Sequence, residues 1–263
     1  MYSSGSGGSG GGSGGSGFGS GGGASDEDVL SDGWRDTQIE LRGPVVAALA
    51  QTFVEIWQSQ GCRGALGEAP PPQQATPGQR VVKVLTSEPT PDGKAANRIY
   101  TSLLAAIDAA RRSVHLTMAY FAPGDDMVQA LCDAARRGVE VQLVLPGRSD
   151  FSLVLHAGRY YYDRLLRAGV RIHEMDHAVM HAKTAVIDGV FSTVGSSNMD
   201  WRSFVANREL NVIVIGDDFG QELEALFRRD VAASRPVDPA QWRRRGMRAR
   251  VMEQIGRAAE RLL

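Results

Sequence analysis

Along residues 80–235, segments whose apolar residues are continuous or alternate are followed by segments whose apolar residues recur with a helical period. Short continuous or alternating apolar runs predict strands, and runs with apolar residues three or four positions apart predict helices. The expected strands cover residues 81–85, 113–118, 139–145, 170–174 and 210–215, with two more within 181–195, and the expected helices cover 95–111, 125–137, 159–168 and 218–233. Strands that alternate with helices favour an α/β fold with a mixed, mostly parallel sheet and helices on both faces.

Two segments of low complexity precede this region. In residues 1–33, Gly and Ser occupy 20 of the first 24 positions, a composition typical of flexible coil. Residues 63–79 are rich in proline and predict a linker. Between these segments, residues 34–62 predict a short strand at 37–41 and one helix that ends before Gly61, and together these elements are too small to fold alone.

Residues 236–263 form a basic segment with seven arginines between Arg243 and Arg261. Apolar residues recur within it at helical spacing, and they are Met247, Val251, Ile255, Ala258 and Leu262. A helix that combines an apolar stripe with many arginines is typical of binding to an anionic membrane surface. Packing of the same stripe on the domain would also explain the pattern.

The 263-residue chain is 43% hydrophobic and has a formal net charge of -1. This length is sufficient for one α/β domain with appendages or for two small domains. The near-neutral charge argues against a wholly basic nucleic-acid surface. Two distant cysteines, Cys62 and Cys132, argue against a disulfide scaffold and indicate a reducing compartment. Because no apolar run approaches about 20 residues and the N-terminus lacks the layout of a signal peptide, we expect a soluble or membrane-peripheral protein.

The residues best suited to chemistry lie within and after an expected hairpin that turns at Asp188-Gly189. His181 and Lys183 share one face of a strand, because side chains alternate with period two. A neutral imidazole can attack phosphorus while an ammonium neutralises charge on the phosphate oxygens. The Ser196 hydroxyl and the Asn198 amide would add hydrogen bonds to the same oxygens. This arrangement requires no metal and no cofactor.

The full spacing is H-x-K-x4-D-x6-G-S-x-N, which resembles the signature of the phospholipase D superfamily. The resemblance covers about residues 81–234 and is to the second half of a bacterial cardiolipin synthase. Further matching segments lie at residues 120–123, 134–139, 198–204 and 207–209. The resemblance implies a phospholipase D-like catalytic domain at residues 80–235.

The resemblance also implies roles for the motif residues. His181 would be either the nucleophile that forms a phosphohistidine or the acid that protonates the leaving alcohol. Lys183 and Asn198, supported by Ser196, would hold the phosphate oxygens. A phosphatidylglycerol-like lipid would lose its headgroup, and a second glycerol-bearing lipid would complete a phosphatidyl transfer that belongs to phospholipid metabolism. Water as the acceptor would make the reaction that of a phospholipase.

Two carboxylates complete the expected site. Asp188, which belongs to the catalytic motif with His181 and Lys183, would organise the site and balance its charge rather than touch substrate. Glu209 would hydrogen-bond the histidine and fix its tautomer, although an exposed carboxylate before a strand has the same sequence pattern. The expected partners are an anionic phospholipid and a membrane surface. The implied location is peripheral, on the cytoplasmic face of the membrane.

The chain departs from the family because it carries one such motif where cardiolipin synthases carry two. Residues 34–62 resemble the end of the missing first half. We therefore expect a fragment of a longer enzyme, a homodimer, or a chain whose partner supplies the second histidine. A phospholipase D-type hydrolase or nuclease acting as a homodimer and a catalytically inactive half-domain stay open as alternatives. The near-neutral charge argues against nucleic acid as substrate.

Overall fold

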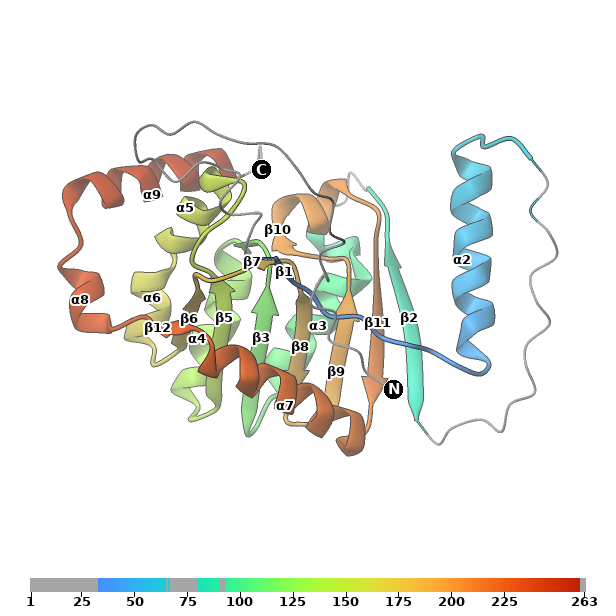
Figure 1. Ribbon diagram of the computed structural model, residues 1–263, viewed down its shortest axis with the longest axis horizontal. Helices are drawn as coiled ribbons and strands as arrows, with labels where there is room; N and C mark the ends of the chain where they lie inside the picture. The colour runs from blue at the N-terminus through green and yellow to red at the C-terminus, as the bar shows by residue number, and fades with distance from the viewer. Residues whose placement is uncertain (1–32, 65, 67–79, 90–92, 261–263) are drawn as a thin grey trace, which may run out of the picture.

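A computed structural model describes residues 33–64, 66, 80–89 and 93–260 of this chain. At its centre lies an eight-stranded sheet with the strand order β12-β6-β5-β3-β8-β9-β11-β2 (Figure 1). These strands are β2 (Val81–Ser87), β3 (Ser113–Met118), β5 (Glu140–Pro146), β6 (Arg171–Met175), β8 (Lys183–Ile187), β9 (Phe191–Gly195), β11 (Glu209–Ile215) and β12 (Arg235–Pro236). Two shorter pairs are β1 (Trp34–Arg35) with β7 (Val179–Met180), and β4 (Phe121–Ala122) with β10 (Met199–Asp200).

The expected α/β class and mixed sheet are confirmed, but the expected predominance of parallel pairs is wrong. Within the eight-stranded sheet, β3–β5 and β5–β6 run parallel, and the five other neighbouring pairs run antiparallel. The difference arises after residue 182, where β8, β9 and β11 follow one another without an intervening α-helix. Antiparallel strands need only such direct connections, whereas parallel strands need a crossover.

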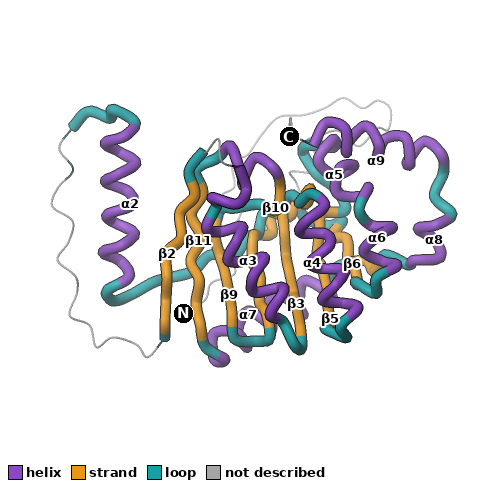
Figure 2. The backbone as a smooth tube through the Cα atoms, turned by 180° about the vertical axis from the view of Figure 1, so that it is seen from behind, coloured by secondary structure: helices purple, strands orange, loops and turns teal. Residues whose placement is uncertain are grey.

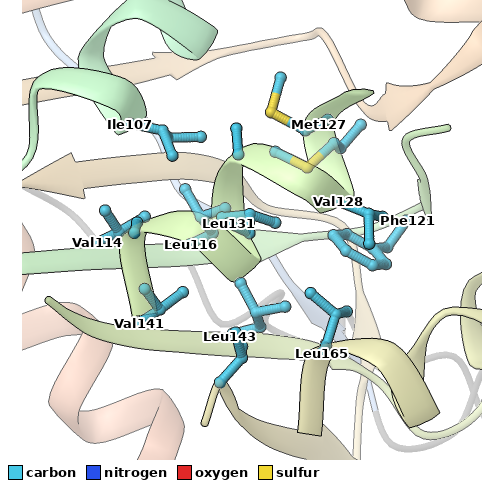
Figure 3. Packing of buried hydrophobic residues seen from close by; sticks show 14 of the residues in the cluster. Ile107, Val114, Leu116, Phe121, Met127, Val128, Leu131, Val141, Leu143 and Leu165 are labelled. Carbon is cyan, nitrogen blue, oxygen red and sulfur yellow. The ribbon is translucent and has the colours of Figure 1, made fainter. Parts of the chain in front are cut away.

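Helices cover both faces of the sheet, as the sequence predicts. On one face lie α3 (Arg98–Ala109), α4 (Asp125–Arg136) and α6 (Tyr162–Arg167), and α7 (Asp217–Ala232) lies on the other (Figure 1 and Figure 2). In the larger core, Leu116 and Leu143 of the sheet meet Leu131 of α4 (Figure 3). A second cluster under α7 consists of Val186, Val194, Val212, Val214, Phe219, Leu223 and Leu226. Because both faces are covered, every residue of β8 is buried.

The expected helix at residues 159–168 is in fact two helices. They are α5 (Ser152–Tyr160) and α6, which meet at Tyr161, and the apolar pattern does not predict most of α5. The position of α5 depends on a close contact with β4, because a Cβ atom at Gly158 would lie 2.3 Å from the carbonyl oxygen of Phe121. Helical periodicity does not reveal a backbone contact of this kind.

The expected strand at residues 37–41 is wrong. Strand pairing falls three residues earlier, on β1, and the expected segment holds a single bridge at Gln38. Ile39 and Leu41 instead pack as partly buried side chains against the cluster under α7. The alternation of residues 37–41 therefore reports contact with the core rather than membership of a sheet.

The expected helix in residues 34–62 is confirmed as α2 (Val45–Ser59), which has no buried residue and stands beside the edge strand β2 (Figure 1). Most of the expected Gly/Ser segment at 1–33 and most of the expected linker at 63–79 lie outside the described residues.

The basic C-terminal segment contains α8 (Pro239–Arg243) and α9 (Met247–Ala259). The second of these helices packs along α5 (Figure 1). The two backbones approach closely at Gly256, where a Cβ atom would lie 2.5 Å from the backbone nitrogen of Ala157. Glycine at this position therefore sets the distance between the helices.

We predict that Gly256→Val lowers the free energy of unfolding by about 1–3 kcal/mol, because the added side chain must push α9 away from α5. Urea unfolding followed by circular dichroism measures the change. Gly246→Ala is the matched control, since a Cβ atom at Gly246 would meet no atom within 4 Å. Equal stability of the Gly256→Val variant and the wild type would show that the two helices do not pack closely.

Candidate active site

Most of the predicted site residues lie at one edge of the sheet. Lys183 begins β8 and Glu209 begins β11, while Ser196 follows the last residue of β9. These ends coincide because β8 and β11 both run antiparallel to β9. His181 directly follows β7 and lies two residues before β8, and Asn198 directly precedes β10. The structure therefore gathers five of the six predicted residues at this edge.

His181 is held by residues of the N-terminal segment. Its backbone N–H donates to the carbonyl oxygen of Arg35 at 2.8 Å, and its Nδ1 lies 2.8 Å from Oδ2 of Asp36. The ring of Trp34 packs edge-on against the imidazole with 4.9 Å between centroids. A carboxylate at Nδ1 favours the tautomer with its proton there, so Nε2 carries the lone pair. The side chain is 47% exposed, which leaves the ring accessible.

Lys183 is a buried cation next to this histidine. Its side-chain Nζ donates to the carbonyl oxygen of His181 at 2.6 Å. Burial lowers the pKa of Lys183, and the carboxylates of Asp36, Glu209 and other nearby acids oppose that shift by favouring the charged form. A buried ammonium close to an imidazole is suited to bind the oxygens of a phosphodiester.

The carboxylate of Glu209 does not bond to His181 in this structure. It accepts hydrogen bonds from the Ser196 hydroxyl at 2.5 Å and from the Asn207 amide at 3.2 Å. Asp36 occupies the position at the imidazole that the sequence assigns to Glu209. The side-chain oxygen of Asn198 is buried and has no hydrogen-bond partner among the described residues. This unpaired oxygen is an acceptor, so it is available to a donor group of a ligand.

Asp188 lies at the opposite end of β8 from the other motif residues. The expectation that it belongs to the catalytic set with His181 and Lys183 is therefore wrong. Five residues of strand, at about 3.3 Å each, separate it from Lys183 by roughly 17 Å. Its carboxylate accepts the backbone N–H groups of Arg111, Arg112 and Ser113. Burial alone would raise the pKa of Asp188, but these donors outweigh burial and hold the pKa below its ordinary value. Asp188 ties the hairpin turn to the loop before β3.

Sequence reasoning missed the contribution of the N-terminal segment to the site. Arg35 donates from Nε and Nη2 to the two carboxylate oxygens of Asp230 on α7, at 2.6 and 2.7 Å. This pair fixes β1, which places Trp34 and the next residue after the strand, Asp36, against the imidazole. The sequence did carry a signal, because this segment resembles the end of the first half of a cardiolipin synthase. That resemblance assigns no role to Trp34, Arg35 or Asp36.

Two further polar groups belong to the rim of the site. The Tyr120 hydroxyl donates to Asp150 at 2.9 Å, and burial together with this bond raises the pKa of Tyr120 to about 12. Tyr120 is therefore a neutral donor at neutral pH. Asp200 accepts the backbone N–H of Ser203, and burial raises the pKa of Asp200 despite that bond. Among the described residues, no group of three or more His, Cys, Asp or Glu side chains is arranged to hold a metal ion.

The family model described as "Cardiolipin synthase, PLD-like domain" matches residues 103–231. These residues are a phospholipase D-like domain. The chain is similar to cardiolipin synthase A of Serratia proteamaculans, with 31% identity over 226 residues, and to the cardiolipin synthase of Geobacillus thermodenitrificans, with 33% identity over 232 residues. The two alignments cover 84% and 88% of this chain and 46% of each relative. The chain thus spans about half the length of the curated relatives it matches.

The phospholipase D-like domain is also similar in fold to a solved structure, the phosphatidylserine synthase of Haemophilus influenzae. The TM-score is 0.54 at 11% identity, and the alignment covers 81% of this chain and 54% of that chain. Within the described residues, no helix has the length and apolar character that crossing a bilayer requires.

We predict that Asp188→Asn lowers the free energy of unfolding at pH 7 by about 1–2 kcal/mol, because the amide is a weaker acceptor for the three N–H groups. The folded-state pKa of Asp188 is lowered, so its stabilisation is complete above the ordinary value of about 4 and is lost as the pH falls through the folded-state value. The difference between wild type and variant should therefore shrink between about pH 5 and about pH 2. Urea unfolding across this pH range measures it.

Asp108→Asn is the control for that series, since Asp108 is exposed near the end of α3. Its stability should follow the wild type within about 0.5 kcal/mol. A difference between Asp188→Asn and wild type that stays constant with pH would contradict the structural role of the Asp188 carboxylate.

Proposed function

We propose that this phospholipase D-like domain transfers a phosphatidyl group between alcohols in phospholipid metabolism, with His181 as the nucleophile. The observation that carries the proposal is the accessible imidazole of His181, held at Nδ1 by Asp36 and flanked by the buried Lys183. The similarity to cardiolipin synthases supports an anionic phospholipid such as phosphatidylglycerol as substrate.

In the proposed reaction, Nε2 of His181 attacks the phosphorus of the lipid phosphodiester. A bond between phosphorus and Nε2 forms, and the bond between phosphorus and the headgroup oxygen breaks. Asp36 stabilises the charge that develops on the imidazole, and Lys183 together with the amide N–H of Asn198 binds the phosphate oxygens. Ser196 supports the site indirectly, because its hydroxyl donates to Glu209. An acceptor alcohol then attacks phosphorus and gives its proton to the same group that protonated the leaving oxygen. The bond between phosphorus and Nε2 breaks, which releases His181. Hydrolysis, with water as the acceptor, is the second candidate reaction. The exposure of the imidazole favours it, because water can reach the phosphohistidine.

The headgroup oxygen needs a proton as it leaves, and the proposal assigns this proton to a second histidine from another phospholipase D-like half. That half would come from a second copy of this chain, from a partner, or from a longer protein. The fraction of the relatives that the chain covers, 46%, supports a need for such a half. Attack by His181 can therefore be tested apart from the proton transfers. Departure of a poor leaving group and deprotonation of the acceptor depend on the second histidine, whereas departure of a good leaving group does not.

The test of His181 as nucleophile uses bis(p-nitrophenyl) phosphate, a soluble phosphodiester whose nitrophenolate leaves without a proton. The wild-type chain should release about one nitrophenolate per chain in a rapid burst, and mass spectrometry should find a nitrophenyl phosphoryl adduct on His181. His181→Ala should show neither result. A folded wild-type chain that forms no adduct would exclude the nucleophile role. Vesicles of phosphatidylglycerol then separate the products, since free cardiolipin indicates transfer and phosphatidic acid indicates hydrolysis.

We predict that Asp36→Asn slows adduct formation by at least about tenfold, because the amide neither fixes the tautomer nor stabilises the imidazolium. The pH dependence of the burst rate should also shift, which loss of structure alone would not produce. Asp36→Glu should retain part of the rate. Glu40→Gln is the control, since Glu40 is exposed in the same segment and pairs with Arg42. An unchanged rate and pH profile for Asp36→Asn would show that the carboxylate does not act through His181.

A further inference from the structure

The apolar stripe of α9 faces solvent in this structure. Met247, Val251 and Ile255 follow one another at intervals of four residues, and they are 76%, 49% and 49% exposed. Ala258 is exposed on the same side of the helix. These four residues are called the α9 outer stripe below. Burial on the domain therefore does not explain the stripe.

The opposite side of α9 makes the contacts with the domain. Gly256 meets α5, and the buried Glu253 pairs with Arg245 at 2.6 Å. Arg245 also pairs with Asp163 of α6 at 2.7 Å. Arg257 similarly pairs with Asp125 and with the buried Glu260. Two of the arginines of this segment thus hold α9 in place.

Four other arginines of this segment flank the outer stripe in the sequence: Arg248 and Arg250 lie in α9, and Arg243 and Arg244 lie at the end of α8 shortly before it. All four are exposed, and none has a carboxylate partner among the described residues. The only acidic residue between Arg243 and Ala258 is Glu253, which is buried on the inner side. The exposed residues of α9 therefore combine an apolar stripe with Arg248 and Arg250 and include no carboxylate, and two more exposed arginines lie shortly before the helix.

The position of α9 links this face to the candidate active site. α9 packs along α5, α5 contacts β4, and β4 pairs with β10 directly after Asn198. Figure 1 shows α9 at the same end of the sheet as β7 and β10, and Figure 2 shows α9 at the same end as β10. His181, which follows β7, and Lys183, which begins β8, lie at this end of the sheet.

We propose that the α9 outer stripe and its four flanking arginines form a docking surface for an anionic phospholipid bilayer, which brings the site edge of the sheet to the lipid. The exposed apolar side chains enter the interface between headgroups and acyl chains, and the guanidinium groups bind lipid phosphates. This docking deepens the proposed function, because it rests on a phospholipid substrate. Binding and catalysis are nevertheless separate measurements.

The experiment measures co-sedimentation of the full chain with vesicles of phosphatidylglycerol and phosphatidylcholine, and with vesicles of phosphatidylcholine alone. The wild type should bind the anionic vesicles, and binding should weaken as salt is raised. Arg244→Glu/Arg248→Glu should reduce the partition constant by at least about twentyfold, as expected for two basic residues at an anionic surface. Val251→Ser/Ile255→Ser should also reduce it, because the apolar contribution is lost.

Arg111→Glu/Arg228→Glu is the matched control. Both residues are exposed, neither has a carboxylate partner among the described residues, and the change of net charge is the same. This control and His181→Ala should bind anionic vesicles as the wild type does. The α9 variants should keep the wild-type burst with bis(p-nitrophenyl) phosphate, which needs no membrane.

Each outcome separates docking from catalysis. If the wild type does not bind anionic vesicles, or if the α9 variants bind as well as the wild type, the docking surface is overturned while the burst still tests the proposed function. Equal loss of binding in the Arg111→Glu/Arg228→Glu control would also overturn it, because net charge alone would then explain binding. Binding without any burst would leave docking in place and contradict the proposed function.

Discussion

The ion pair between Arg35 and Asp230 joins the N-terminal segment to the domain that carries the motif. Both side chains are largely buried, and removal of one partner from a buried pair leaves an unpaired charge that costs about 3–5 kcal/mol. The carbonyl oxygen of Arg35 accepts the backbone N–H groups of His181 and Ala182, and the next residue, Asp36, bonds the imidazole. The position of the reactive ring therefore depends on the ion pair between the N-terminal segment and α7.

Strand β8 connects two ends of the molecule that have different tasks. At one end, the carboxylate of Asp188 binds three backbone N–H groups and fixes the turn at a positive φ of 55°. At the other end, Lys183 enters the site. All residues of β8 are buried between two helical layers, so the strand cannot shift along its neighbours. The turn at one end therefore fixes the position of Lys183 at the other end. A motif that is continuous in sequence thus divides into a structural half and a chemical half.

The sequence was most informative where one local pattern decides the structure. The hairpin at Asp188-Gly189 and the convergence of His181, Lys183 and Ser196 follow from turn chemistry and from the period of two along strands. The antiparallel majority of the strand pairs, the helix α5 and the role of Asp36 were not predictable in this way. Each depends on contacts between residues far apart in the chain, such as Gly158 against Phe121 and Asp36 against His181, which are 145 residues apart.

The C-terminal segment shows the same distinction within one helix. Periodicity identifies Met247, Val251 and Ile255 as residues that share a face, but it does not say whether that face meets protein or solvent. The deciding features are on the opposite side: Gly256, whose lack of a side chain permits close approach to α5, and Glu253, which is buried with Arg245. The apolar residues are then free for a second surface, and in this chain the charged residues carry the packing.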